Sequence, residues 1–147
     1  MAAHKLEQAK ALVLQFAGYE FTNDDVLYEA IDTTGLRIAQ SNQRLALLGD
    51  VILKHFILDD WYPTGQAKGI GNDLVATIGS NANLATAGAR VGLEECIVTH
   101  PGNPGSVSDG MLSTAVEAVL GAIYVDSRKD MAVVRTAMEG LGLKFGG

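Results

Sequence analysis

The sequence is poor in the features that mark secreted, membrane-spanning or disordered proteins. Cys96 is the only cysteine, so no disulfide can form within the chain, which suits a reducing compartment. Hydrophobic residues make up 48% and charged residues 19%, a balance that excludes disorder. No apolar run approaches the roughly 20 residues that cross a bilayer. Charges at Lys5, Glu7 and Lys10 interrupt the N-terminal apolar stretch, unlike a secretory signal. We therefore expect a soluble, intracellular protein without a membrane partner.

Basic residues are also few. The chain has 11 Lys and Arg against 17 Asp and Glu, which gives a net charge of -6. Only Arg128 and Lys129 are adjacent, whereas a nucleic-acid-binding surface usually gathers basic side chains to neutralise phosphates. Folding can bring distant basic residues together, but the composition predicts weak RNA binding by this chain alone.

The pattern of apolar residues predicts a single all-α domain over residues 1–147. A chain of this length can bury about 70% of its unfolded surface and needs no structural metal or disulfide. Apolar residues recur at helical spacing, and glycines separate the segments. The predicted helices cover residues 5–16, 25–31, 41 or 42–61, 72–78, 81–91, 110–125 and 129–141, with a loop at 100–109. The helix ending at residue 61 is apolar around most of its circumference, which predicts burial at the centre or at a subunit interface.

Two acidic residues stand out because each lies in a strongly apolar helix. Asp50 is in the helix 41–61, and Glu117 is the only charge in the middle of its own helix. Burying a lone carboxylate is costly, so the two acids could meet and share a cation or hydrogen-bond donors. Alternatively, each acid reaches solvent at a helix edge or pairs with an arginine such as Arg44 or Arg90.

Two segments carry a resemblance to a known family. Residues 42–50 read N-Q-R-L-A-L-L-G-D, which is similar to the ribonuclease III signature N-E-R-L-E-F-L-G-D. Residues 114–126 read T-A-V-E-A-V-L-G-A-I-Y-V-D, which resembles the second acidic helix of that family, D-T-x-E-A-x-x-G-A-x-x-L-D. The segment 17–21, with Leu27 and residues 29–30 after it, fits the first two helices of the family. The likeness spans nearly the whole chain and is greatest to small fungal members that consist of the nuclease domain alone.

The resemblance implies an all-α fold of the ribonuclease III endonuclease-domain type. Members of the family cut double-stranded RNA with Mg²⁺, or with Mn²⁺ in its place. Four carboxylates, two from each acidic helix, hold the metal site, where metal ions activate water and stabilise charge on phosphate. The resemblance also implies a homodimer, with apolar residues of the signature helix near the interface and a valley for the duplex.

The sequence departs from the family pattern at the metal site. Asp50 and Glu117 match two of the four carboxylates, but Ala46 and Thr114 stand at the positions of the other two. Gln43 replaces a further family Glu nearby. Mg²⁺ prefers anionic oxygen ligands, and neither a methyl group nor a neutral hydroxyl replaces a carboxylate. The pattern therefore predicts loss of a two-metal site, leaving at most one weakly held Mg²⁺ or Mn²⁺ at Asp50, Glu117 and Thr114.

Three hypotheses about function follow. The leading one is a catalytically impaired family member that acts through dimerisation, RNA association or partner binding. The second is an active metal-dependent endoribonuclease that uses Asp50, Glu117, Thr114 and water around one metal ion. The third is an acidic valley recruited for a non-RNA ligand or reaction, in which burial separates the pKa values of the two acids. No double-stranded-RNA-binding domain follows in the sequence, which also favours weak RNA binding.

Overall fold

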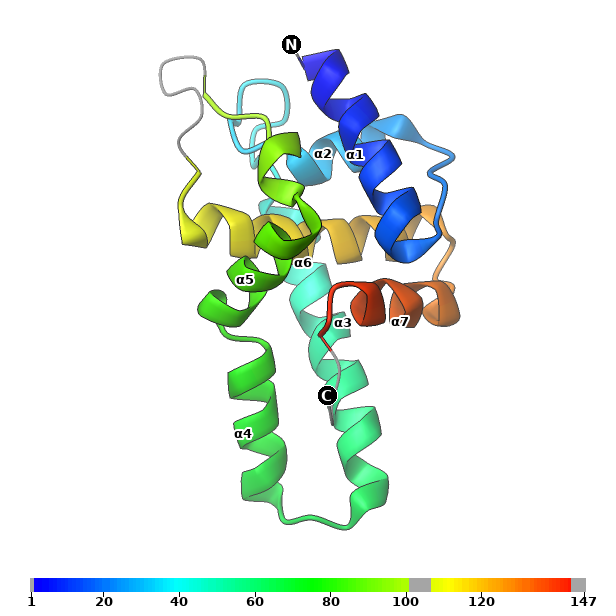
Figure 1. Cartoon of the computed structure of the whole chain (residues 1–147), viewed down its shortest axis with the longest axis vertical. Coiled ribbons are helices and arrows are strands. Elements are labelled where there is room, and N and C mark those ends of the chain that lie inside the picture. Colours follow the sequence, from blue (N-terminus) through cyan, green and yellow to red (C-terminus); the bar gives the residue numbers. More distant parts are fainter. Residues whose placement is uncertain (1, 101–106, 144–147) are drawn as a thin grey trace.

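Seven α-helices and two short 3₁₀-helices make up the regular structure in residues 2–100 and 107–143, which the computed structural model describes (Figure 1). Their bounds are α1 Ala2–Ala17, α2 Asp24–Ile31, α3 Gln43–Trp61, η1 Tyr62–Thr64, α4 Lys68–Ile78, α5 Asn81–Val91, η2 Leu93–Cys96, α6 Asp109–Asp126 and α7 Met131–Gly140. Over those residues, strand-like pairing is limited to one bridge between Asp32 and Val98. The all-α prediction is confirmed. Among the described helices, none combines the length and apolar character that a membrane span needs.

The helix α6 occupies the centre of the body. It packs against α2, α3, α5 and α7, and Figure 1 shows it running across the middle of the molecule. The residues from Ala118 to Ile123 are all buried. Sequence analysis expected the helix ending at residue 61 to be central or at a subunit interface. The structure gives the central place to α6, because α3 buries one face and leaves apolar residues of its other face exposed.

The element boundaries follow local signals, with one clear error. The helix α5 spans residues 81–91 as predicted, and its N-cap Ser80 accepts a hydrogen bond from the backbone N–H of Asn83 at 3.1 Å. The helix α4 begins at Lys68 rather than at residue 72. Gly71 is a buried residue of this helix, and a Cβ added there would lie 2.8 Å from the ring of Trp61, so a side chain has no room. Most of the predicted loop 100–109 lies outside the described residues.

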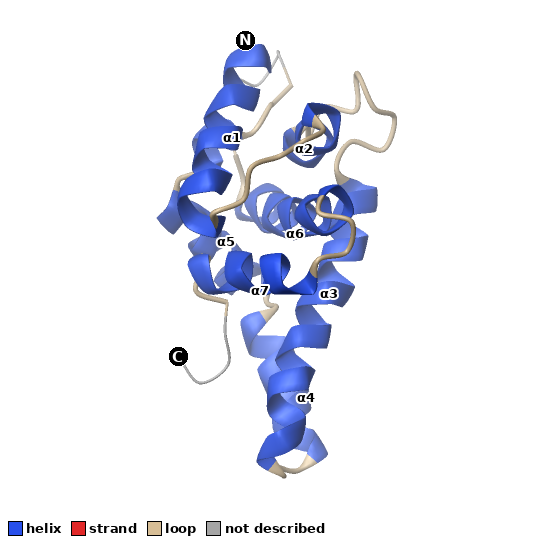
Figure 2. Ribbon diagram, turned by 90° about the vertical axis from the view of Figure 1, so that its right-hand side faces the viewer, coloured by secondary structure: helices blue, strands red, loops and turns tan. Residues whose placement is uncertain are grey.

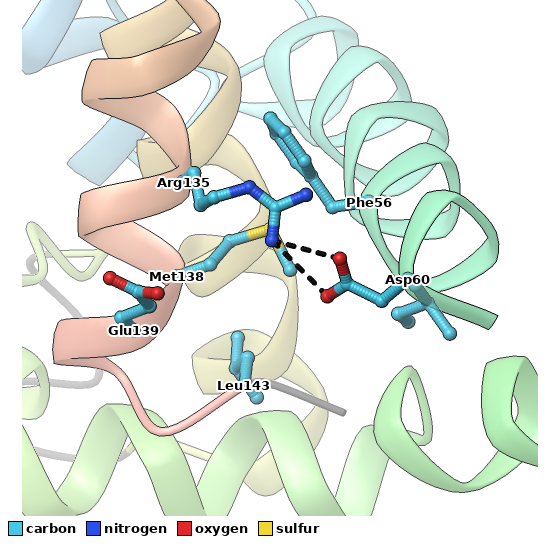
Figure 3. A pocket seen from close by; sticks show the side chains of 7 residues that line it. Phe56, Asp60, Arg135, Met138, Glu139 and Leu143 are labelled. Carbon is cyan, nitrogen blue, oxygen red and sulfur yellow. Dashed lines mark hydrogen bonds and ion pairs between the residues drawn. The ribbon is translucent and has the colours of Figure 1, made fainter. Parts of the chain in front are cut away.

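The helices α3 and α4 form a hairpin that extends away from the body, as Figures 1 and 2 show from two directions. The helix α7 fastens the body to this hairpin through one arginine (Figure 3). The Arg135 guanidinium pairs with Asp60 at 3.1 Å and with Asp59 at 3.4 Å. It also lies over the ring of Phe56, 4.7 Å from the centroid. These contacts join the C-terminal end of α3 to α7.

Candidate functional site

The candidate site forms where α3 crosses α6 with almost no space between the two backbones. Glycines face each other at the crossing. A Cβ at Gly49 would overlap the carbonyl oxygen of Glu117, and a Cβ at Gly121 would overlap the carbonyl oxygen of Leu45. Only glycine permits this approach on either helix. The crossing therefore fixes the part of α3 that carries Asp50 against the part of α6 that carries Glu117.

The two acids singled out in the sequence meet at this crossing. Asp50 and Glu117 line the same groove, and their side chains interact directly. Burial, followed by the hydrogen bond and the negative charge of Asp50, raises the pKa of Glu117 from 4.5 to about 7. The groove therefore favours the neutral form of Glu117 far above the usual pH range of a carboxylic acid.

A lysine that sequence analysis missed completes the acidic pair. Lys54 Nζ lies 2.9 Å from Asp50 Oδ2, one helical turn further along α3. Neither proposed arginine takes this role, because Asp50 pairs with Lys54, and Arg90 instead donates to the carbonyl oxygen of Leu141. The signal was present in the sequence, since an Asp and a Lys four residues apart on a helix face each other.

The substituted positions line the same open groove. Gln43, Ala46 and Thr114 face it together with Gly79 and Asn81. None of these side chains carries a charge, so among the described residues Asp50 and Glu117 are the only ionisable groups lining this groove. All five candidate positions from the sequence therefore come together at one place on the surface.

The residues present do not fit a metal centre of the type that the family resemblance implies. The ammonium of Lys54 pairs with Asp50, and the raised pKa of Glu117, about 7, leaves close to half of that carboxyl group protonated at neutral pH. The Thr114 hydroxyl donates to the Gly110 carbonyl oxygen at 2.8 Å, and Ala46 offers no ligand atom. No cluster of three or more His, Cys, Asp or Glu side chains suited to a metal occurs in residues 2–100 and 107–143. Mg²⁺ prefers several anionic oxygen ligands, and this groove offers two carboxyl groups.

Comparison with known sequences assigns the family. A family model described as Ribonuclease-III-like matches residues 32–139. The chain is 35% identical over 123 residues to Ribonuclease 3 of Vibrio vulnificus, covering 80% of this chain and 53% of that protein. It is 34% identical over 124 residues to Ribonuclease 3 of Actinobacillus pleuropneumoniae, covering 80% and 55%. The chain belongs to the ribonuclease III-like family, and it spans about half the length of these relatives.

Comparison with solved structures supports the same fold. Two structures of the nuclease domain of ribonuclease III from Campylobacter jejuni each superpose with a TM-score of 0.80. Their sequence identities are 23% and 22%, and the matches cover 91% and 93% of this chain and 96% of each domain. One of the two is described as showing flexibility in a region involved in dimer formation. At this identity the likeness establishes the fold alone.

Proposed function

We propose that this chain is a catalytically impaired member of the ribonuclease III-like family. It acts as a homodimer that binds RNA or another partner without cutting RNA. The observation that carries the proposal is the composition of the groove at the helix crossing. Only Asp50 and Glu117 remain of the four expected carboxylates, and Lys54 is paired with the first of them. The groove keeps the scaffold of a nuclease site without the anionic ligands that would hold its metals.

Cleavage of labelled double-stranded RNA tests the proposal. The wild type is incubated with graded Mg²⁺ and Mn²⁺ beside Glu117→Ala and beside the double variant Ala46→Glu/Thr114→Asp, which restores the missing carboxylates. We expect no cleavage by the wild type at any metal concentration. Circular dichroism on each variant shows that it has kept its helices, since Ala46 is buried and a larger side chain must turn into the groove.

The outcomes are distinct. Cleavage by the wild type that disappears in Glu117→Ala would overturn the proposal and show that two carboxylates suffice. An inactive wild type with an active double variant would support the proposal strongly, because only the two metal-binding carboxylates would then be missing. Absence of cleavage by both proteins supports the loss of catalysis and indicates that the scaffold has also lost productive RNA binding.

The proposed homodimer rests on the exposed face of α3. Three apolar side chains of α3 and that of Tyr62, the first residue of η1, form what we call the α3 stripe. They are spaced by four, seven and four residues, a spacing that follows one side of a helix. Their exposed fractions are 71% for Leu47, 60% for Val51, 39% for Leu58 and 77% for Tyr62. An apolar surface of this kind favours a partner, and the Campylobacter jejuni domain of the same fold has a region involved in dimer formation. A second copy of this chain is the partner that we propose.

Light scattering after size exclusion measures the oligomeric state. We expect a dimer at micromolar concentration and a monomer for Val51→Glu, which places a charge in the α3 stripe. Leu14→Glu is the matched control, because Leu14 is 50% exposed but lies on α1. A monomeric wild type, or a dimer that persists in Val51→Glu, would contradict the proposed interface.

The charges of the folded chain support weak rather than strong RNA binding. Lys10, Arg37, Lys54 and Arg135 all form ion pairs with aspartates. A basic side chain that is paired within the protein releases little free energy when it meets a phosphate, because it must first leave its carboxylate. The net charge of -6 acts in the same direction.

A further inference from the structure

The charge balance at the helix crossing points to a second role for Lys54. Two carboxyl groups meet there, and such a pair is unfavourable when both are ionised unless a positive charge lies nearby. In a metal-dependent nuclease site, divalent ions supply that charge. Here the nearest positive charge belongs to the chain itself, because Lys54 Nζ lies 2.9 Å from Asp50 and also interacts electrostatically with Glu117.

Lys54 is well placed to act as a permanent counter-ion. It lies on α3, one turn from Asp50, and α3 crosses α6 closely at Gly49. Its side chain is 48% exposed and that of Asp50 is 29% exposed, so the ion pair is accessible to solvent beside the groove that Asp50 lines. A cation that bridges both acids would compete with this ammonium for Asp50.

We propose that Lys54 takes the place of the metal as the cation of the Asp50–Glu117 pair, so that the groove excludes divalent ions. This inference rests on the proposed loss of the metal site, but it makes a separate claim about one side chain. An isolated contact between a surface Lys and Asp contributes little to stability. The role proposed for Lys54 is therefore tested by the affinity of the protein for a divalent cation. An ion pair with a purely structural role would leave that affinity unchanged.

The experiment is a calorimetric titration of the full chain with Mn²⁺ at constant ionic strength. It compares the wild type with Lys54→Met, which keeps the apolar stem and removes the charge. Lys68→Met is the matched control, because Lys68 is an exposed lysine at the start of α4 and is not the lysine that pairs with Asp50. We expect Lys54→Met to bind Mn²⁺ about tenfold more tightly than the wild type, the effect of removing one nearby positive charge. We expect Lys68→Met to behave as the wild type does.

A third variant shows where the ion binds. In the double variant Lys54→Met/Glu117→Gln the gain should disappear, because the ion would lose one of its two carboxylates. Equal Mn²⁺ affinity in the wild type and Lys54→Met would overturn the inference, as would a gain that survives in the double variant. Failure of the proposed function appears instead as RNA cleavage by the wild type, so the two failures are distinguishable.

Discussion

Two acids on the same helix have opposite surroundings. Asp126, at the C-terminal end of α6, accepts hydrogen bonds from the Tyr19 hydroxyl, from the backbone N–H and hydroxyl of Thr22, and from the backbone N–H of Asn23. Burial alone would raise the pKa of Asp126, but these donors outweigh it and hold the pKa below its ordinary value. The ionised carboxylate thereby joins the loop after α1 to the end of α6.

Glu117, nine residues earlier on the same helix, has no comparable set of donors. Its partner is another acid, Asp50, and its pKa is raised to about 7. A carboxylate that organises a fold is surrounded by donors, whereas one kept beside a second acid costs stability. The difference fits a structural role for Asp126 and the proposed role of Glu117 as a remnant of a metal site.

The largest effect on stability is expected from a substitution at the helix crossing that places Glu117 beside Asp50. Gly49→Ala puts a Cβ into the Glu117 carbonyl, and two helix backbones cannot move apart without disturbing the core. We expect a loss of about 3 kcal/mol in the free energy of unfolding, measured with urea. Gly69→Ala is the control, because nothing lies within 4 Å of its added Cβ. Gly69→Ala should stabilise α4 by about 0.5 kcal/mol or more. Equal effects of Gly49→Ala and Gly69→Ala on the free energy of unfolding would contradict the close crossing.

The next effect sharpens the contrast between the two acids. Asp126→Asn places an NH₂ group among donors and should cost about 2 kcal/mol in the free energy of unfolding. Glu117→Gln should cost nothing at pH 8, because it removes a charge that its surroundings disfavour. Asp73→Asn, an exposed acid on α4, controls for the change from carboxylate to amide. Urea midpoints that fall further for Glu117→Gln than for Asp126→Asn would reverse the assignment of roles.

The dependence of stability on pH comes last, because Glu117 is only half-buried and solvent screening reduces the effect of its raised pKa. For Glu117 the folded pKa of about 7 exceeds the ordinary 4.5, so the folded chain keeps a proton that the unfolded chain has released. Its contribution to stability therefore falls as pH rises from about 4.5 to 7 and is constant above that range. The urea midpoint of the wild type should fall relative to Glu117→Gln between pH 5 and pH 8. A wild-type urea midpoint that rises relative to Glu117→Gln over this pH range would contradict the raised pKa of Glu117.

For Asp126 the sign is opposite. Its folded pKa is below the ordinary 3.8, so its stabilising effect is present above that pH and is lost as pH falls through the folded value. Acid unfolding of Asp126→Asn should therefore depend less on pH below about 4 than that of the wild type. This comparison uses the same urea measurement at low pH.

Local signals made most of the helices predictable. Asn23 and Ser80 cap α2 and α5 with their side chains, as residues of these types do at helix starts. The unusual acids in apolar helices, with the two motif segments, were enough to select the candidate site. The start of α4 was not predictable in this way, because Gly69 and Gly71 together suggest a loop. Only the structure shows that Gly71 packs against the ring of Trp61, where a larger residue would not fit.

The sequence by itself determined the helical class, the family motifs and the absence of two carboxylates, because these depend on residue identity and on spacings within a few helical turns. Only the tertiary structure decided which helix is central, that Asp50 meets Glu117, and that Lys54 rather than an arginine is the partner of Asp50. These outcomes depend on how closely α3 and α6 approach at Gly49 and Gly121. That distance is set by the packing of segments about 70 residues apart, which no local pattern encodes.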